Sequence, residues 1–229
     1  MEDKIHIYFM PGLAASSRIF EYITLTDDRF ALHHLEWLEP ENEKETLSDY
    51  AAKYVNMITH KLPVLIGVSF GGLLVQEIGR LMEVRKVIII SSVKNEDELP
   101  KRLNYLRKSR AYKLFPSKRL SKMDDFSKYN FNPKLKKKGE LYNKYLSIRN
   151  EKYLNWAIHN MLNWKNNSIE QDLMHIHGTM DEIFPIKYVK DCIPVEGGTH
   201  AMIIVKAKKI SAIIYFHDIS MENMRFHHL

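Results

Sequence analysis

A serine at position 69 lies in residues 67–72, GVSFGG, which have the form G-x-S-x-G. The pattern alone is weak evidence, since a chain of this length contains it by chance about once in ten times. Its position adds weight, because it joins an expected strand over residues 63–68 to an expected helix over residues 71–82. A sharp strand-to-helix turn with small flanking residues exposes a serine hydroxyl for nucleophilic attack. We therefore predict that Ser69 is a nucleophile, with a turn of no chemical role as the alternative.

A nucleophilic serine needs a base, and the base needs an acid that orients it. His200 follows two glycines between the last expected strand, residues 192–195, and an expected closing helix over residues 201–216. Asp181 follows an expected strand over residues 173–177, and ligands meet open α/β sheets at the carboxyl ends of strands. We predict His200 as the base and Asp181 as the acid. A surface or helix-capping histidine and a turn aspartate are the alternatives.

Other acids lie near enough in the sequence to compete for the role of Asp181. Glu182 and Asp191 are close neighbours of it. Glu96 and Asp97 follow an earlier strand, but they lie a few residues too far beyond its end.

The loop after the first strand, over residues 10–20, is a candidate for binding a developing oxyanion. Such a site takes one backbone N–H from the residue after the nucleophile, here Phe70, and one from an early strand-to-helix loop. Leu13 is our candidate for the second donor, and we expect the side chains of Phe70 and Leu13 to line an acyl pocket. Ser16 and Ser17 are better placed to cap the next helix than to react.

Strand-like and helix-like segments alternate along the chain, which predicts a parallel sheet with helices on both faces. The run Val-Ile-Ile-Ile at residues 87–90 is apolar without alternation, as expected of a central strand buried on both faces. Further strands are expected over residues 5–10 and 30–37, and a further helix over residues 46–60.

Residues 94–168 differ from the rest of the chain. They are rich in Lys, Arg, Tyr, Leu and Asn and contain Pro100, Pro116 and Pro133, so we predict a helical cap inserted into a core made of residues 1–93 and 169–229. An insert at this point emerges above the carboxyl edge of the sheet, where Ser69, Asp181 and His200 should meet. We expect it to roof that site and to supply apolar residues to a pocket.

Positive charge is concentrated in this insert. Residues 94–152 contain 18 lysines and arginines against 7 aspartates and glutamates, a net +11, within a chain of net charge +6. A basic surface can attract nucleic acid or anionic lipid. We see no stacking motif and no sustained amphipathic run, so we interpret the charge as a solvated helical surface and expect no nucleic-acid partner.

Three motifs in order, at residues 67–72, 177–185 and 197–200, resemble the α/β-hydrolase superfamily and its small, capped esterase and lipase-like members. The resemblance covers most of residues 4–93 and 170–216. It implies an α/β-hydrolase fold, with a mostly parallel central sheet, helices on both faces and a helical cap.

The resemblance also implies an activity. It is the hydrolysis of a small-molecule carboxylic ester, or of a thioester or amide, through an acyl-enzyme on Ser69 and without a cofactor. One departure is that the early loop reads Pro11-Gly12, where the family usually has His-Gly. A non-catalytic ligand-binding or interaction protein on the same fold is the alternative.

Composition places limits on the remaining functions. With 229 residues and a single cysteine, Cys192, the chain has room for one domain with an insert and cannot form an internal disulfide. We expect a cytoplasmic protein, since we find neither a signal peptide nor an apolar run long enough to span a membrane. The pairs His33-His34 and His227-His228 are not joined by carboxylates or cysteines at metal-ligand spacing, so we predict no metal site.

Overall fold

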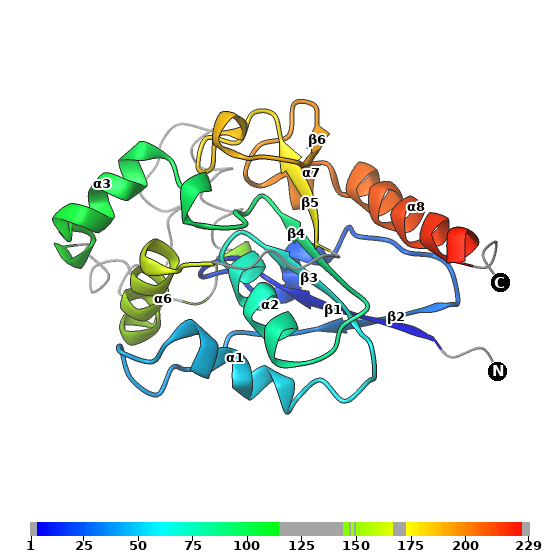
Figure 1. Ribbon diagram of the computed structural model, residues 1–229, viewed down its shortest axis with the longest axis horizontal. Helices are drawn as coiled ribbons and strands as arrows, with labels where there is room; N and C mark the ends of the chain where they lie inside the picture. The colour runs from blue at the N-terminus through cyan, green and yellow to red at the C-terminus, as the bar shows by residue number, and fades with distance from the viewer. Residues whose placement is uncertain (1–3, 115–143, 147, 149, 167–172, 226–229) are drawn as a thin grey trace.

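The computed structural model in Figure 1 describes most of the chain. The described residues are 4–114, 144–146, 148, 150–166 and 173–225, with side chains of the last helix described as far as residue 216. Much of the predicted insert, residues 115–143 with Pro116 and Pro133, therefore lies outside the described residues.

Six parallel strands form one sheet in the order β2-β1-β3-β4-β5-β6. The strands are β1 Ile5–Met10, β2 Phe30–His34, β3 Val64–Val68, β4 Lys86–Ile90, β5 Leu173–Gly178 and β6 Ile193–Val195. Each corresponds to a strand predicted from sequence, and β4 pairs on both sides, with β3 and β5. The prediction of a central strand at residues 87–90 is confirmed, because these residues are buried.

Strand β2 is shorter than predicted, ending at His34 rather than at residue 37. Beyond it, tyrosine hydroxyls replace a strand partner for the backbone. The Tyr54 hydroxyl donates to Glu36 O at 2.9 Å, and Leu38 N donates to the Tyr50 hydroxyl at 2.9 Å. These side-chain bonds satisfy backbone groups that a continuing ladder would otherwise pair.

The described residues include six α-helices. They are α1 Leu47–Val55, α2 Phe70–Leu81, α3 Lys101–Ser109, α6 Glu151–Asn163, α7 Met202–Val205 and α8 Ala207–Arg225. Helix α1 ends earlier than predicted, at Val55, although Ile58 keeps the apolar pattern and is buried. The predicted closing helix is interrupted at Lys206, whose φ of −122° and ψ of 20° are not helical.

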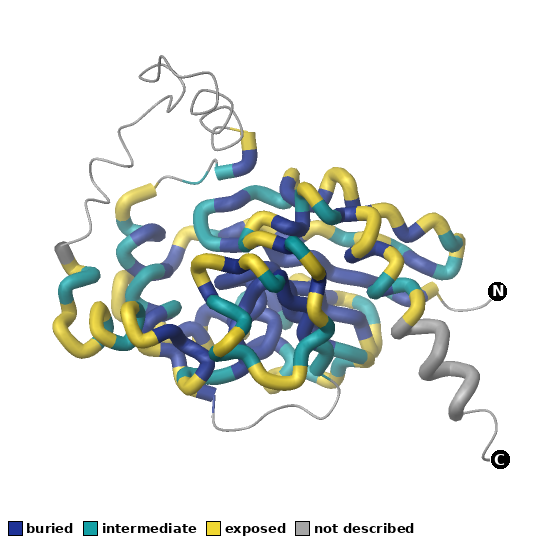
Figure 2. Tube along the Cα trace, turned by 90° about the horizontal axis from the view of Figure 1, so that it is seen from above, coloured by how far each residue is buried: buried dark blue, intermediate teal, exposed yellow. Residues whose placement is uncertain are grey.

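Helices cover both faces of the sheet (Figure 1). Tyr8 and Met10 of β1 pack in a cluster with residues of α1, α2 and α6, whereas Ile7 and Phe9 pack on the other face with residues of α7 and α8. Figure 2 shows the buried residues concentrated along the strands, with exposed residues around them. The alternation along β1 thus divides the core into two layers, one on each side of the sheet.

In the described part of the chain, every helix is too short or too polar to cross a membrane.

Helix α6, from the predicted insert, shares the core of the α1 and α2 layer. Trp156 is fully buried, its ring lies 4.2 Å from that of Tyr50, and its indole N–H donates to Glu45 O at 2.8 Å. By contrast, none of the residues of α3, all of which the structure describes, is buried. The described part of the insert is therefore anchored to the sheet by α6. The boundaries of the predicted cap stay a prediction.

Replacing Trp156 should test this anchor. Trp156→Ala removes a fully buried ring and one of the two N–H donors to Glu45 O, so we expect the free energy of unfolding to fall by about 3–5 kcal/mol. Urea denaturation followed by circular dichroism measures the change. Tyr105→Ala, on exposed α3, is the control and should change stability by less than about 0.5 kcal/mol. Equal effects of the two substitutions would contradict the anchoring role of α6.

Candidate active site

Ser69 lies in the turn between β3 and α2 with a strained backbone. Its φ is +54° and its ψ is −119°, outside the regions that side chains other than glycine prefer. Such conformations cost about 1–3 kcal/mol and persist only where the surroundings hold them. Two hydrogen bonds do so here, since Ser69 N donates to Ile90 O at 2.9 Å and the Ser92 hydroxyl donates to Ser69 O at 2.7 Å.

The glycines on either side of Ser69 permit a close approach of backbone segments. A Cβ added at Gly67 would lie 2.3 Å from Gly71 O, and one added at Gly71 would lie 2.3 Å from Pro11 O. No real Cβ tolerates such contacts, so the spacing of the G-x-S-x-G motif has a steric cause. A Cβ at Gly12 would lie 3.4 Å from Ser69 Cβ, so the loop after β1 passes directly beside the serine.

The structure brings Ser69, His200 and Asp181 together. His200 Nε2 lies 3.0 Å from Ser69 Oγ, and His200 Nδ1 lies 2.9 Å from Asp181 Oδ2 and 3.1 Å from Asp181 Oδ1. The side chain of His200 is 28% exposed, whereas that of Asp181 is completely buried. The imidazole therefore joins a buried carboxylate to a hydroxyl and can be reached by solvent.

Backbone amides hold the Asp181 carboxylate in place. Its Oδ1 accepts from Ile183 N at 2.8 Å and from Phe184 N at 2.9 Å. Glu182, the neighbouring alternative, is exposed. The turn after β5 therefore directs the carboxylate of Asp181 toward His200 and leaves that of Glu182 exposed.

Two loops carry Asp181 and His200, and they are packed backbone to backbone. A Cβ at Gly178 would lie 2.2 Å from Gly198 O, and Met180 N donates to Gly198 O at 2.8 Å. Gly197, just before, has a φ of +64°, which favours glycine. The two glycines before His200 therefore let its loop lie against the loop that carries Asp181.

Two buried histidines support the acid from beneath, and the sequence analysis did not assign them. His177 Nε2 lies 2.7 Å from Phe184 O, so it carries a proton and donates to that carbonyl. His177 Nδ1 then accepts from His175 Nε2, 3.0 Å away. Because Phe184 N also bonds Asp181, this chain braces the turn that holds the carboxylate. His175 and His177 lie two residues apart on β5, which puts both on one face of the sheet. This spacing is the sequence signal that could have identified them as a pair.

Aromatic side chains hold the loop that carries Leu13. The Trp37 indole N–H donates to Gly12 O at 2.9 Å, and Ala14 N donates to the Tyr153 hydroxyl at 3.3 Å. Ala14 has a φ of +61°, so the loop needs such support. Trp37 and Tyr153 thus supply contacts to a loop that reads Pro-Gly instead of His-Gly. Neither residue stood out in the sequence, because each lies far from the loop along the chain.

The prediction that Phe70 lines an acyl pocket is wrong. Its side chain is fully buried, and its ring stacks on Trp37 with centroids 5.0 Å apart and contacts Trp156 edge-on. Phe70 is the first residue of α2, and its ring points into the core of that layer. Leu13, by contrast, is only partly buried.

The parallel sheet, the strand-to-helix turn at Ser69 and the loops after β5 and β6 are those of an α/β-hydrolase fold. Residues 24–188 match the model of a family described as Uncharacterised protein family (UPF0227). This chain is a member of that family. No curated protein matches the chain.

Solved structures of several proteins resemble this one over nearly its whole length. BpoC from Mycobacterium tuberculosis H37Rv has a TM-score of 0.68 at 12% identity, covering 94% of this chain and 92% of its own. A thermophilic esterase from Thermogutta terrifontis has a TM-score of 0.63 at 15% identity, covering 99% and 92%. MenH from S. aureus has a TM-score of 0.66 at 14% identity, covering 93% of each chain. At these identities the similarity establishes the fold.

The buried histidines should make stability depend on pH. Burial lowers the pKa of both His175 and His177 below the ordinary value, so below about pH 6.5 the unfolded chain binds more protons than the folded one. The free energy of unfolding should therefore fall as the pH falls below that value, by up to about 1.4 kcal/mol per pH unit for each histidine.

Urea denaturation at a series of pH values measures this slope. His175→Gln and His177→Gln should each reduce it, whatever they do to stability at neutral pH. A slope that is the same in the wild-type protein and in both variants would show that the two imidazoles do not carry the effect.

Proposed function

We propose that this protein is a serine hydrolase that cleaves a carboxylic ester, or a thioester or amide, of a small or medium acyl substrate. The observation that carries the proposal is the hydrogen-bonded series Ser69 Oγ, His200 Nε2, His200 Nδ1 and Asp181 Oδ2, with links of 3.0 and 2.9 Å. A hydroxyl, an imidazole and a buried carboxylate in this order make a serine nucleophilic.

In the first half of the reaction, Ser69 Oγ attacks the substrate carbonyl carbon while His200 Nε2 takes the hydroxyl proton. Asp181 stabilises the imidazolium that forms and keeps Nδ1 protonated. His200 then gives the proton to the leaving alcohol, thiol or amine as the tetrahedral intermediate collapses, leaving an acyl group on Ser69.

In the second half, a water molecule gives a proton to His200 and attacks the acyl carbon. The second intermediate collapses, Ser69 recovers its proton and the carboxylic acid leaves. Both intermediates carry a negative oxygen, for which we assign the backbone N–H groups of Phe70 and Leu13 as donors. Phe70 N opens helix α2, where the helix dipole also favours negative charge.

The solved structures that resemble this chain support the proposal by analogy. One of the similar structures is described as an esterase, and α/β-hydrolase folds carry other activities as well.

We assign α3, in the described part of the predicted insert 94–168, as part of the roof of this site. The Arg102 guanidinium on α3 donates to the backbone carbonyls of Glu182 and Ile183, at 3.1 Å in the case of Ile183, and so binds the turn that carries Asp181. Ile183 and Met180 are exposed, so this turn presents apolar surface to solvent. A substrate with an apolar acyl group suits such surroundings.

Covalent labelling should test the nucleophile. A fluorophosphonate probe should label the wild-type protein once per chain, because only an activated serine attacks it. Ser69→Ala should abolish labelling and keep the fold, as judged by circular dichroism, and Ser48→Ala on the exposed face of α1 should label normally. Unlabelled wild-type protein would favour a non-catalytic ligand-binding protein, and labelling that persists in Ser69→Ala would refute the assignment.

Hydrolysis of p-nitrophenyl esters of increasing acyl length should test the role of Asp181 as the acid that orients His200. Asp181→Asn replaces the buried carboxylate with an amide and favours the wrong imidazole tautomer, so kcat should fall by about 10⁴-fold. Glu182→Gln is the matched control, since it makes the same change one residue away on an exposed side chain, and it should leave kcat nearly unchanged. The opposite pattern would place the acid at Glu182.

A further inference from the structure

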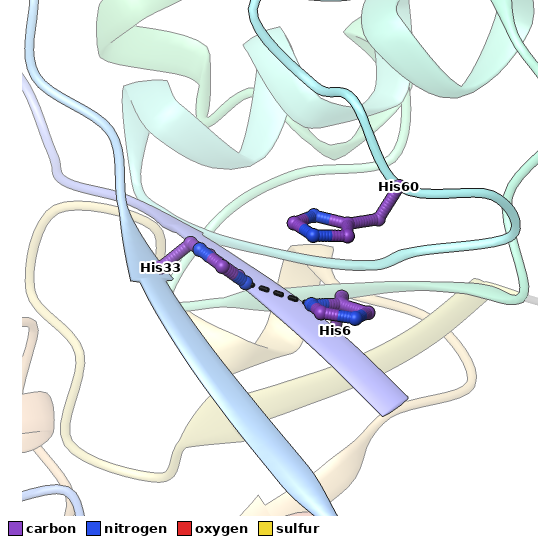
Figure 3. A group of neighbouring side chains, drawn as sticks. All are labelled: His6, His33 and His60. Atoms are coloured by element: carbon purple, nitrogen blue, oxygen red, sulfur yellow. Dashed lines mark hydrogen bonds between the residues drawn. The ribbon is translucent and has the colours of Figure 1, made fainter. Parts of the chain in front are cut away.

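Three histidines from separate segments gather on the sheet (Figure 3). His6 belongs to β1, His33 belongs to β2, and His60 lies between the end of α1 and the start of β3. One ring nitrogen from each lies within 4.8 Å of the others, and all three residues are partly exposed. Figure 3 shows the His33 ring pointing toward His6, and the His60 ring lying over the His6 ring and nearly parallel to it.

The contacts among these rings are close. His6 Nδ1 lies 2.9 Å from His33 Nε2, and the rings of His6 and His60 stack with centroids 3.4 Å apart and planes 8° apart. The rings of His33 and His60 have centroids 4.9 Å apart. Imidazole nitrogens from three separate segments therefore lie within reach of one small ligand.

A tyrosine beneath the cluster orients one of the rings. The Tyr8 hydroxyl lies 2.7 Å from His60 Nδ1, and the Tyr8 ring stacks on His33 with centroids 4.5 Å apart. In the tautomer in which Nδ1 donates to the hydroxyl oxygen, Nε2 carries the lone pair that His60 can offer to a ligand. Histidines that bind metals are oriented in this way by a hydrogen bond to the other ring nitrogen.

His6 and His60 lie toward the amino ends of β1 and β3, whereas Ser69 follows the carboxyl end of β3. Met10, at the carboxyl end of β1, pairs with Gly67 of the serine turn, whereas His6 lies four residues earlier on β1. Four residues of a strand span roughly 13 Å. The cluster therefore takes no part in the proposed reaction, and it would bind a ligand whether or not Ser69 is a nucleophile.

We propose that His6, His33 and His60 form a binding site for a divalent transition-metal ion of the Zn²⁺ and Ni²⁺ class. Three imidazoles without thiolates suit these ions, and exposure leaves room for water as a further ligand.

Binding one ion requires the stacked rings of His6 and His60 to turn, because imidazole lone pairs lie in the ring planes and these two planes are only 8° apart. Zinc–imidazole bonds of about 2.0–2.1 Å in a tetrahedral site place the ligand nitrogens roughly 3.4 Å apart. The existing separation of 2.9 Å between the nitrogens of His6 and His33 is near this value, and the ring that donates there can move its proton to its other nitrogen. Bound metal would join β1, the edge strand β2 and the segment before β3, and so stabilise this end of the sheet.

Titration of the metal-free protein with Zn²⁺ alone, by isothermal titration calorimetry, tests the proposal. All proteins compared should carry His227→Gln and His228→Gln, so that this pair cannot bind the added ion. The resulting reference protein should bind one Zn²⁺ per chain and unfold at a higher temperature when Zn²⁺ is present. His60→Ala and His33→Gln should each abolish binding, and Tyr8→Phe should weaken it by about 10–100-fold.

His34→Gln is the matched control. His34 is the next residue of β2, but its ring packs against Phe9 and Phe20 on the other face of the sheet, so binding should be unchanged. Circular dichroism should show that the variants are folded. Absence of Zn²⁺ binding in the reference protein, or equal affinity in the reference, His33→Gln and His60→Ala proteins, would overturn the proposal.

Discussion

Backbone segments around Ser69 approach one another more closely than side chains at positions 67 and 71 would permit. Added Cβ atoms there would lie 2.3 Å from the carbonyl oxygens of Gly71 and Pro11, respectively. This approach places the serine turn, helix α2 and the loop after β1 in one compact unit. Because Ser69 has a φ of +54°, hydrogen bonds and packing must hold that unit together against backbone preference.

Aromatic packing supplies much of that restraint. Trp37 stacks on Phe70, next to Ser69, and its indole N–H holds Gly12 O in the adjoining loop. Trp156 packs against Phe70 from helix α6, and Tyr153 of the same helix accepts a bond from that loop. Core packing in the α1, α2 and α6 layer is therefore continuous with the candidate active site, so changes in this core should affect both stability and the geometry around Ser69.

The parallel sheet separates two groups of chemically capable residues. Because every strand points the same way, loops from the carboxyl ends of β3, β5 and β6 meet at one edge, where Ser69, Asp181 and His200 contact one another. Of the three clustered histidines, His6 and His60 lie toward the other end. The proposed hydrolase site and the proposed metal site are therefore made of different residues, with the sheet as their common support.

Local sequence determined the main features of this fold. The apolar run at residues 87–90 predicts the central strand, and glycines beside Ser69 predict the sharp turn, because each depends on neighbours along the chain. The order of the motifs also led to His200 and Asp181.

Local pattern did not reveal that Phe70 turns into the core, that Trp37 holds the loop beside the serine, or that the closing helix breaks. It also missed the cluster of His6, His33 and His60, since only the pairing of β1 with β2 and the path of the chain before β3 bring these rings together. Such contacts depend on residues far apart in sequence, and tertiary structure alone decides them.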